Sequence, residues 1–392
     1  MERVRVSIVH NILTPYMVPV FNEIASRPTL DIVVYSMGES ERNREWKVEG
    51  GVEFRHVILR GSHFAFGDRD TSTVHVNLSI LQKLSRERPE VIVSSGYSSI
   101  TNQLAFYSAK TAGIPFLLWS GSTQGEKHWL KPGLRPYLKW FVANVDGFIA
   151  YGSAARDYLI CLGAPRAEIS IAPNTVDTSF FKESVMRRNR VTIRQNLREQ
   201  LGLNASVLVL YVGQLIERKG VDILIRAMSI VQQKRDVGLV VVGDGRERSS
   251  LTHLSRGLKE VVFTGNIKYR DLPDYYALAD MLVLPSREEV WGLVVNEAMA
   301  CGTPILCSSN AGCSRDLVKD SVNGFVFQPG DVNTLAQRIE ELASDAELRG
   351  SFGSSSQQII AGGFTIKHLA DGVEQAITRV ATKNPVKRNL AQ

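Results

Sequence analysis

Cysteine and histidine are scarce in this chain of 392 residues, which has four of the first and seven of the second. The histidines form no His-Glu-x-x-His or similar metal-binding group. The cysteines have neither the paired short spacings of a zinc site nor the density of a secreted disulfide scaffold. We therefore expect no structural metal, and we expect reduced cysteines that are mostly buried: Cys161, Cys301, Cys307 and Cys313.

Long hydrophobic runs are also lacking. No stretch reaches the roughly 18 uninterrupted apolar residues of a membrane-spanning helix, and the N-terminus enters a strand-like run without a signal-peptide pattern. The composition, with 44% apolar and 22% charged residues, is typical of a globular protein. Because 392 residues are many for one hydrophobic core, we expect two domains, and we expect a cytoplasmic location.

Acidic residues are fewer than basic ones, which leaves a formal net charge of +6 and a pI near 9.1. Such a surplus suits a surface that meets nucleic acid, an anionic membrane or an acidic substrate. Most basic residues are scattered among acidic ones, and no basic patch interleaved with aromatic residues indicates nucleic-acid binding. We interpret the clearest cluster, Met186–Arg198, as the solvated face of a helix or linker, in preference to a dedicated anion-binding surface.

Strand-like and helix-like segments alternate along the first half of the chain. The strand-like segments are almost wholly apolar, which is typical of a parallel sheet with helices on both faces. The predicted strands are Val4–Val9, Asp31–Ser36, Phe54–Leu59, Val91–Ser95, Pro115–Ser120, Gly147–Tyr151 and Ile169–Ala172. The predicted helices are Pro19–Ala25, Val76–Arg86, Ile100–Ala112, Leu134–Val145 and Ala154–Cys161.

The alternation stops near Asp177 and restarts at Ser206, after a basic connector that contains a helix. The second set of strands is Val207–Val212, Gly238–Val242, Val261–Thr264, Met281–Leu284, Ile305–Ser308 and Gly324–Phe327. The second set of helices is Val221–Gln232, Glu247–Ser255, Leu272–Ala279, Trp291–Ala300, Asp331–Ala343 and Ala346–Ile360. We therefore expect an α/β fold of two Rossmann-like domains at 1–178 and 179–364, an amphipathic helix at about 365–380, and a flexible tail at 381–392.

Two glutamates flank the boundary between the predicted strand Met281–Leu284 and the helix that follows it. Glu289 and Glu297 are eight positions apart, so on one helix they would be about 80° apart in azimuth and about 12 Å apart along the axis. That separation is too large for one small reacting group. We therefore place Glu289 in the loop before the helix and Glu297 two turns into it, where each contacts a different part of one elongated ligand.

The start of this helix is suited to an anion. The backbone N–H groups of Val290 to Leu293 and the positive end of the helix dipole favour a phosphate, and Gly292 allows a close approach. A ligand with a polyol at each end and phosphate between them is a nucleotide sugar. Taken alone, the pair also has a simpler interpretation, in which Glu289 favours a helix N-terminus and Glu297 is a solvated helix residue.

Two more strand ends of the second half face the same edge of the predicted sheet, where doubly wound folds bind their ligands. Arg218 and Lys219 precede a predicted helix, so their cationic heads are placed to reach phosphates at its N-terminus. A capping or surface role is the alternative for both. Glycine-bearing turns support the same edge more weakly, at Gly213-Gln214 and Gly243-Asp244.

The first half offers polar side chains at its own strand ends. The loop after the first strand has no Gly-x-Gly-x-x-Gly. Its position at the end of a strand suits contact with an acceptor substrate, and a turn that is merely shaped by its prolines is an equally good interpretation. Asp68 and Asp70 have the Asp-x-Asp spacing of some metal-binding nucleotide-sugar enzymes, but we interpret them as a solvated turn and His128 as a surface residue. The candidate acceptor contacts are Asn11, Thr14, Tyr16, Ser120 and Ser122.

Five motifs of the second half occur together and in order. They are Tyr211-Val-Gly-Gln-Leu-x4-Gly220, Val241-Val-Gly-Asp-Gly245, Val262-Phe-Thr-Gly-Asn266, Pro285-Ser286 and Glu289-x7-Glu297-Ala-Met-Ala-Cys-Gly302. Together they resemble the family 4 retaining glycosyltransferases of GT-B fold. The resemblance extends more weakly into the first half, through Pro173-Asn174, Val176-Asp177 and the Pro15-Tyr16 loop.

The resemblance implies two facing Rossmann-like domains with a deep cleft between them, and a final helix that crosses back to the first domain. It also implies that the second domain holds the donor without a metal or another cofactor. By this resemblance Glu289 binds hydroxyls of the transferred sugar, Glu297 binds the ribose, and Lys219 neutralises the diphosphate with Arg218 beside it. The other donor-binding residues that it implies are Gly213, Gln214, Gly243, Asp244, Asn266, Ile267, Val290, Trp291, Gly292, Leu293 and Val294, with Asn266 and Ile267 at the nucleobase.

The sequence departs from the family pattern at two positions. Gln214 stands where the family usually has an arginine, so either Arg218 supplies that charge or diphosphate binding is weaker. Ser120 stands where many relatives have a histidine near the reacting centre, so no side-chain base is assigned. No carboxylate of the first domain is suited to act as a nucleophile. We therefore favour attack by the acceptor on the face from which the leaving group departs, with the departing phosphate taking the acceptor's proton.

The resemblance implies a UDP- or GDP-linked hexose as donor and a hydroxyl of a glycan or lipid-linked saccharide as acceptor. By similarity to bacterial envelope-polysaccharide transferases, Arg44–Trp46 and the basic surplus suggest an acceptor at the inner face of the cytoplasmic membrane, with peripheral contact to anionic lipid. Two alternatives stay open. They are a GT-B-like sugar phosphorylase or epimerase, and a non-catalytic protein that binds nucleotide sugars.

Overall fold

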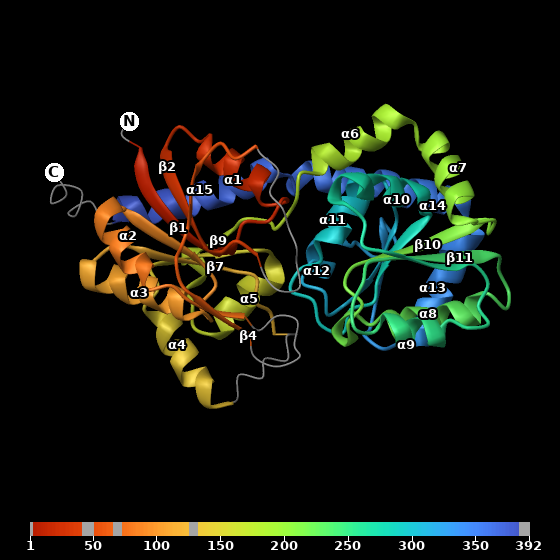
Figure 1. Ribbon diagram of the computed structural model, residues 1–392, viewed down its shortest axis with the longest axis horizontal. Helices are drawn as coiled ribbons and strands as arrows, with labels where there is room; N and C mark the ends of the chain where they lie inside the picture. Colours follow the sequence, from red (N-terminus) through yellow and green to blue (C-terminus); the bar gives the residue numbers. More distant parts are fainter. Residues whose placement is uncertain (1–2, 41–50, 66–72, 125–131, 384–392) are drawn as a thin grey trace. The chain divides into compact units, whose positions relative to one another are not determined.

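The computed structural model describes residues 3–40, 51–65, 73–124 and 132–383 (Figure 1). The chain divides into two compact units, and the first lies within Met1–Ser122, His128–Val176 and Ile366–Gln392. The second unit lies within Thr123–Lys127 and Asp177–Thr365. The predictions for Arg44–Trp46, Asp68, Asp70 and His128 fall outside the described residues.

A parallel sheet of seven strands forms the centre of the first unit, in the order β3-β2-β1-β6-β7-β8-β9. Its inner strands are buried on both faces, which explains why they are almost wholly apolar in sequence. The strands are β1 (Val4–Ile12), β2 (Leu30–Gly38), β3 (Arg55–Ile58), β6 (Val91–Ser95), β7 (Phe116–Ser120), β8 (Gly147–Ala150) and β9 (Ile169–Ile171).

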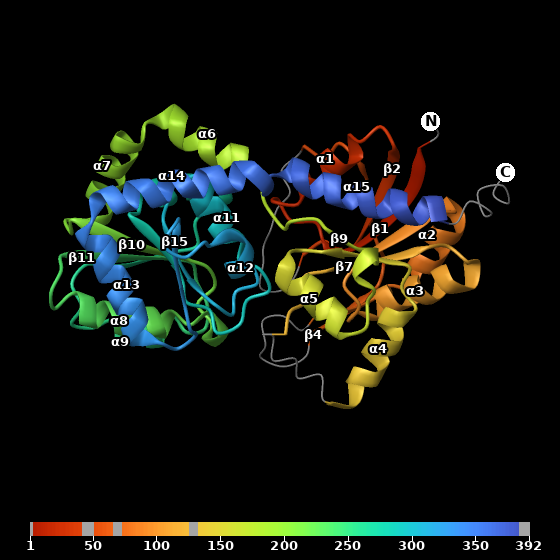
Figure 2. The ribbon, with the colours of Figure 1, turned by 180° about the vertical axis from the view of Figure 1, so that it is seen from behind.

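Alternate side chains of these strands enter two separate hydrophobic cores. On one face they meet α1 and the C-terminal helix α15, which Figure 2 shows lying along the strands. On the other face they meet α2, α3, α4 and α5. The bounds are α1 (Val18–Ala25), α2 (Ser79–Glu87), α3 (Ile100–Ala112), α4 (Arg135–Ala143), α5 (Ser153–Cys161) and α15 (Ile366–Lys383), with the short 3-10 helices η1 (Pro132–Leu134) and η2 (Arg166–Glu168).

An antiparallel hairpin in the first unit was not expected from the sequence. Its strands are β4 (Ser62–Ala65) and β5 (Thr73–Val76), which pair with His63 opposite His75. The helix predicted from Val76 therefore begins only at Ser79, because the residues before it belong to β5. At the other end of the chain, α15 continues to Lys383, so residues 381–383 are helical and the prediction of a tail from 381 is wrong there.

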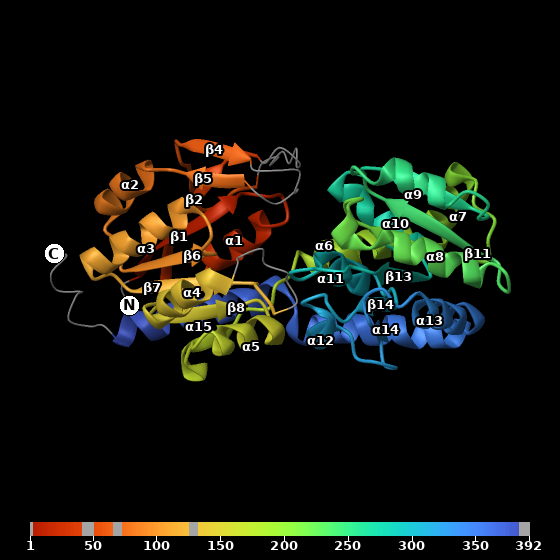
Figure 3. The same cartoon turned by 90° about the horizontal axis from the view of Figure 1, so that it is seen from below.

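The second unit repeats the same strand order on a smaller scale. Its six parallel strands follow the order β12-β11-β10-β13-β14-β15, and Figure 3 shows them enclosed by helices. The strands are β10 (Val207–Val212), β11 (Val237–Val242), β12 (Val261–Gly265), β13 (Met281–Leu284), β14 (Ile305–Ser308) and β15 (Gly324–Phe327).

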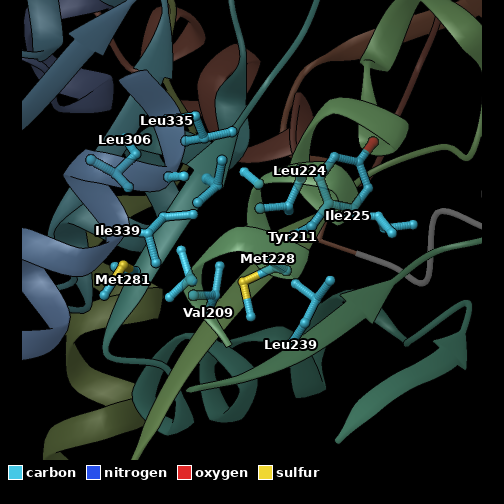
Figure 4. Close-up of a cluster of buried hydrophobic side chains, with 14 of the residues drawn as sticks. Val209, Tyr211, Leu224, Ile225, Met228, Leu239, Met281, Leu306, Leu335 and Ile339 are labelled. Atoms are coloured by element: carbon cyan, nitrogen blue, oxygen red, sulfur yellow. The ribbon is translucent and has the colours of Figure 1, made fainter. Parts of the chain in front are cut away.

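The main core of the second unit lies between the sheet and two amphipathic helices (Figure 4). Leu224 and Met228 of one helix and Ile339 of the other meet strand residues such as Val209 and Tyr211. These helices are α8 (Val221–Val231) and α13 (Val332–Ser344), and the remaining ones are α9 (Arg248–Leu254), α10 (Leu272–Leu278), α11 (Leu293–Ala300), α12 (Ser314–Leu317) and α14 (Ala346–Gly363), with the 3-10 helices η3 (Glu217–Lys219) and η4 (Tyr269–Asp271).

The basic connector differs from its prediction as a solvated face with one helix. It forms two helices, α6 (Thr178–Arg188) and α7 (Arg190–Leu201). Arg190 donates to the carbonyl oxygens of Cys301 and Ala279 at 3.0 and 3.1 Å. Arg194 donates to both carboxylate oxygens of Asp280 at 3.1 Å. The interpretation as a solvated face is therefore wrong for these two arginines, which attach α7 to the unit.

In both sheets the chain starts at a central strand, adds two strands on one side of it, and then adds the remaining strands on the other side. The direction reverses between β1 and β6 in the first unit, and between β10 and β13 in the second. In such sheets the loops beyond the carboxyl ends of these two strands diverge, and ligands bind there. The loops after β10 and β13 are therefore the place to examine for a site in the second unit.

Candidate functional site

Lys219 and Glu289 come from the two loops that follow β10 and β13. Lys219 ends the 3-10 helix η3, and Glu289 lies in the loop between β13 and α11, as the sequence predicted. The ammonium group of Lys219 donates to Oε2 of Glu289 in an ion pair. The exposed fractions of the two side chains are 14% and 11%. The structure thus joins two predicted site residues that are 70 positions apart.

Helix α11 begins two residues later than predicted. Gly292 has a φ of 103°, which an L side chain rarely adopts, so the chain enters the helix only at Leu293. The first intrahelical bond runs from the amide of Val295 to the carbonyl of Gly292 at 2.9 Å. The N–H groups of Leu293 and Val294 precede it, and helix geometry gives them no intrahelical acceptor. They supply the N-terminal amides that the prediction assigned to Val290 to Leu293.

The side chain of Trp291 has a structural part in this helix start. It is 3% exposed, and its indole nitrogen donates to Oδ1 of Asn296 at 2.9 Å. Its carbonyl oxygen accepts from the amide of Cys313 at 3.1 Å. Any role of the Trp291 side chain in donor binding therefore has to be indirect, through the position of α11, and its backbone N–H group stays a predicted donor contact. Val290, in contrast, is exposed beside it.

Glu297 is not a solvated helix residue, because it is only 5% exposed. The hydroxyl of Tyr276 donates to its Oε2 at 2.5 Å. Burial raises the pKa of Glu297 to about 7, and the hydrogen bond from Tyr276 offsets part of this effect. The simpler interpretation of Glu297 is thus wrong, and near neutral pH this carboxyl group exists in both protonation states.

The two glycine-bearing turns pack tightly against each other. The amide of Gly213 donates to the carbonyl of Val242 at 3.0 Å, and the amide of Gly243 to that of Gly265 at 2.8 Å. A Cβ on Gly243 would lie 1.9 Å from the carbonyl oxygen of Gly213. The carboxylate of Asp244 pairs with Arg248 at 2.8 Å. Glycine at 243 is therefore required by the contact between the two turns themselves.

The remaining donor-side predictions lie at the same edge. The carbonyl oxygen of Gln214 accepts from the buried hydroxyl of Tyr211 at 2.8 Å. Arg218 reaches the carbonyl of Glu288 at 3.5 Å, so its guanidinium lies against the loop that carries Glu289. Asn266 is exposed and Ile267 is half-buried, directly after β12.

The candidate acceptor contacts at the carboxyl edge of the first sheet are uncharged side chains. Thr14 is 3% exposed, and its hydroxyl has no hydrogen-bond partner among the described residues. Tyr16 is half-buried and Asn11 is exposed. The hydroxyl of Ser120 accepts from the amide of Ser122 at 3.2 Å. These candidate acceptor contacts lie at or after the carboxyl ends of β1 and β7, where hydroxyl groups of a ligand would be recognised.

The sequence analysis did not identify two further residues at this edge of the first sheet. His10, at the end of β1, shares a hydrogen bond of 2.8 Å between its Nδ1 and the hydroxyl of Ser95. Trp119, near the end of β7, is 3% exposed, and its indole N–H has no acceptor in the part of the chain that the structure describes. Their positions at strand ends were the available signal, but both side chains are also ordinary core residues.

A metal site was not expected, and among the residues 3–40, 51–65, 73–124 and 132–383 no group of three or more His, Cys, Asp or Glu side chains is placed to hold a metal ion. None of the helices described is long and apolar enough to cross a membrane. Cys301, Cys307 and Cys313 are buried free thiols, as expected, whereas Cys161 is exposed.

A separate open hollow of about 970 Å³ lies along α9. It is lined by hydroxyl and basic side chains, and it contains neither Lys219 nor Glu289. Its lining residues include Gly245, Arg246, Ser249, Thr252, His253 and Arg256. The Lys219–Glu289 pair therefore lies outside this hollow.

The arrangement as a whole has the parts needed for an anionic ligand with a polyol. A half-buried ammonium group stands beside a carboxylate, and the N-terminal amides of α11 follow the carboxylate in the same loop. An ammonium and helix amides stabilise phosphate oxygens, while a carboxylate accepts hydrogen bonds from hydroxyl groups. Two doubly wound units with such an edge in the second define the class of GT-B folds.

Solved structures of similar fold support this class. The crystal structure of HepE from Anabaena in complex with UDP matches with a TM-score of 0.74, 18% identity, 96% of this chain and 100% of that chain. The structure of WaaG, a glycosyltransferase involved in lipopolysaccharide biosynthesis, matches with a TM-score of 0.66, 17% identity, 96% of this chain and 99% of that chain. At such identities the likeness shows the fold alone, which is GT-B.

Family models match both halves of the chain. Residues 193–359 match the model described as "Glycosyl transferases group 1", and residues 28–180 match "Glycosyltransferase Family 4". The chain therefore belongs to glycosyltransferase family 4. The resemblance inferred from the five motifs is confirmed.

Curated relatives are similar over part of their length. The alpha-D-kanosaminyltransferase of Streptomyces kanamyceticus is 32% identical over 45% of this chain and 47% of that protein. The GDP-mannose-dependent alpha-(1-6)-phosphatidylinositol monomannoside mannosyltransferase of Mycolicibacterium smegmatis is 30% identical over 59% of this chain and 62% of that protein. The chain spans about half the length of the first curated relatives that it matches.

Proposed function

We propose that the protein is a retaining glycosyltransferase that moves a hexose from a UDP- or GDP-linked donor to a hydroxyl of a glycan or lipid-linked acceptor. The observation that carries the proposal is the Lys219–Glu289 ion pair, which lies at the edge where doubly wound sheets generally bind ligands. The ammonium group would neutralise the diphosphate, and the carboxylate would accept hydrogen bonds from the sugar. A UDP complex of a structural relative, HepE, is consistent with this donor class.

The proposed reaction needs neither a metal nor another cofactor. The bond between the anomeric carbon and the β-phosphate oxygen breaks, and the acceptor oxygen bonds to the same face of that carbon. The departing phosphate takes the proton of the acceptor hydroxyl. Lys219 and the N-terminal amides of α11 stabilise the charge that develops on this phosphate, which is electrostatic catalysis by groups already in position.

A binding experiment tests the donor part of the proposal. The melting temperature of the protein is measured with UDP, GDP and ADP and their hexose conjugates, in the presence of EDTA. We expect one nucleotide class to raise it, because a ligand that binds only the folded state stabilises that state. The rise should be lost in Lys219→Ala. No rise with any nucleotide would contradict the proposed donor class and would favour a sugar phosphorylase.

A turnover experiment tests the reaction. The nucleotide sugar identified by binding is incubated with glycan and lipid-linked acceptors, and release of nucleoside diphosphate is measured with the anomeric configuration of the product. We expect release that depends on the acceptor, with the configuration of the donor retained. Inversion of configuration would contradict same-face attack. Release of an isomerised sugar without an acceptor would indicate an epimerase.

A role in envelope polysaccharide or lipopolysaccharide synthesis, at the inner face of the cytoplasmic membrane, completes the proposal. The supporting feature is an exposed aromatic face on α3 and α4 of the first unit. Tyr107 and Trp140 are 47% and 46% exposed, with ring centroids 6.4 Å apart. Neither helix contains an acidic residue, whereas Lys110, Arg135 and Lys139 are basic. Amphipathic aromatic and basic side chains suit an anionic lipid surface.

Vesicle binding tests this peripheral contact. We expect the protein to sediment with vesicles of phosphatidylcholine and phosphatidylglycerol and not with phosphatidylcholine alone. Trp140→Ala and Lys139→Glu should each reduce sedimentation. Equal binding to both vesicle types, or none to either, would contradict an electrostatic contact.

A further inference from the structure

Arg287 connects the two loops that carry Lys219 and Glu289. Its Nη1 donates to Oδ1 of Asp222 at 2.7 Å, and its Nη2 donates to Oδ2 at 2.8 Å. Nη1 also donates to the carbonyl oxygen of Glu217 at 2.8 Å. Asp222 lies in the first turn of α8, directly after the turn of Lys219. Two parallel hydrogen bonds from a planar guanidinium to one carboxylate fix the relative orientation of the two groups as well as the distance between them.

Backbone contacts extend this connection. The amides of Arg287 and Glu288 both donate to the carbonyl oxygen of Arg218, at 2.8 and 3.2 Å. The side-chain amide of Asn310 donates to the carbonyl oxygen of Arg287 at 2.9 Å. Gly220 approaches the loop so closely that a Cβ there would lie 2.3 Å from the carbonyl oxygen of Pro285. The residues on both sides of Lys219 are thus attached to those just before Glu289.

A similar ion pair at the opposite end of β13 supplies a comparison. Asp280 precedes β13, and both of its carboxylate oxygens accept from Arg194. That pair lies at the amino edge of the sheet, at the opposite end of the strands from the loops of the site. The exposed fractions of its two side chains are 25% and 12%. The pair of Arg287 and Asp222 is more exposed, at 37% and 27%. Because exposed pairs add little stability, a purely structural purpose explains it poorly.

We propose that the Arg287–Asp222 pair is a positioning element that holds the Glu289 loop in register with the Lys219 turn. This inference rests on the proposed function for its catalytic consequence. Lys219 and Glu289 would act on different parts of one donor, so their separation must match the distance between the diphosphate and the sugar hydroxyls. A displacement of about 1 Å in such an arrangement can cost about 100-fold in rate. Arg287 and Asp222 would act through the loops, without touching the donor.

Hydrogen exchange tests the positioning role without any substrate. The full-length protein is compared with Arg287→Gln and with the matched control Arg194→Gln. We expect Arg287→Gln to accelerate exchange in a peptide covering residues 285–290, whose amides at Arg287 and Glu288 are held by Arg218. Arg194→Gln should leave this peptide unchanged. Unchanged exchange of the 285–290 peptide in Arg287→Gln would overturn the proposal.

Kinetics test the catalytic consequence. We expect Arg287→Gln to lower kcat about 10- to 100-fold with a smaller change in the donor KM, because the diphosphate and base contacts remain. Arg287→Lys, which keeps the charge and loses the parallel bonds, should recover part of kcat. Arg194→Gln should keep kcat and lose only stability. A kcat loss of equal size in Arg194→Gln would indicate a general structural effect and would overturn the proposal.

A double-mutant cycle decides whether the two residues act as a pair. Asp222→Asn should lower kcat about as much as Arg287→Gln, and the double variant should be little worse than either. Independent, multiplying effects would overturn the proposal. If the unaltered protein turns over no nucleotide sugar, the proposed function fails, while the exchange experiment still supports or overturns the positioning role.

Discussion

The carboxyl edges of the two sheets carry different chemistry, although the sheets share one strand order. In the second unit this edge is charged and its ions are paired, through Lys219 with Glu289 and Arg287 with Asp222. In the first unit the candidate acceptor contacts after β1 and β7 are uncharged, and among the described residues the hydroxyl of Thr14 and the indole N–H of Trp119 have no hydrogen-bond partner. A diphosphate needs opposite charge, whereas a sugar acceptor needs hydrogen-bonding groups. Under the proposed function, the same fold would bind two ligand classes through the different loops that it carries.

The largest effect should come from the charge of the second edge. Lys219→Ala should lower transfer about 1,000-fold, since one positioned electrostatic group can be worth about that factor. The control is Lys234→Ala, whose ammonium pairs with Glu340 on the exposed surface of the same unit and should leave transfer unchanged. Initial rates at saturating donor measure both. A loss below about fivefold in Lys219→Ala would mean that the charged edge does not bind the reacting phosphate.

The buried carboxyl group of the second edge should make this unit sensitive to pH. The pKa of Glu297 is about 7 in the folded state and 4.5 without burial, so the folded protein binds a proton more readily. Its free energy of unfolding should therefore fall as pH rises from about 4.5 to about 7, by about 3 kcal/mol. Exchange of the most protected β10 amides measures this fall.

The control for this pH dependence is Glu297→Gln, which keeps an acceptor for Tyr276 and has no proton to lose. Its stability should stay flat over the same pH interval. The most protected amides of β1 in the first unit should also show no such fall in either protein. A parallel fall in β1 would mean that the pH dependence does not arise from Glu297.

Glycines at the two edges should differ in what they tolerate. Gly243 and Gly96 both have positive φ, at +127° and +111°. A Cβ at Gly243 meets a carbonyl oxygen at 1.9 Å, whereas the nearest atom at Gly96 is Nδ2 of Asn102 at 3.5 Å. We expect Gly243→Ala to cost about 2 kcal/mol more than Gly96→Ala, because overpacking adds to backbone strain. Chemical unfolding followed separately for each unit measures this difference, and equal costs would contradict it.

The smallest effect, on the acceptor KM, should come from Trp119 at the carboxyl edge of the first sheet. Trp119→Phe keeps the aromatic ring and removes the indole N–H. If this group donates to an acceptor hydroxyl, its loss should raise the acceptor KM about fivefold, as expected for about 1 kcal/mol, and leave the donor KM unchanged. Steady-state kinetics with each substrate varied in turn measure both. A change in the donor KM alone would contradict this prediction, because it would mean that Trp119 contacts the donor and not the acceptor.

Most of the regular structure was predictable, because buried parallel strands carry a strong apolar signal. The strands β6, β10, β13, β14 and β15 have the predicted bounds. The β4–β5 hairpin was missed because its two strands have four residues each and carry no apolar run. Gly292 delayed the start of α11 because its positive φ is a backbone property that the hydrophobic pattern does not contain.

The candidate site was predictable residue by residue but not in its contacts. Glu289 in a loop and Lys219 at a turn follow from local patterns, whereas their ion pair joins positions 70 apart. The bonds from Arg287 to Asp222 span 65 positions, and nothing near Arg287 in the sequence indicates its partner. The hydrogen bond from the indole of Trp291 to Asn296, which buries this side chain at the start of α11, also has no signal in the sequence. Such pairings depend on the tertiary fold, which local patterns do not encode.

Helix α15 has a consequence for the order in which the protein can fold during synthesis. The core beneath α1 includes Leu369, Val373 and Ile377 together with Ile8 of β1. The ribosome therefore completes the first strand of this unit, at Ile12, more than 350 residues before it begins the helix that covers the strand, at Ile366. Until that helix emerges, the part of this face that α1 does not cover stays open, whereas the second unit already has all of its described elements. The unit that is synthesised first is thus the one that finishes folding last, and its open face is where a chaperone would be needed.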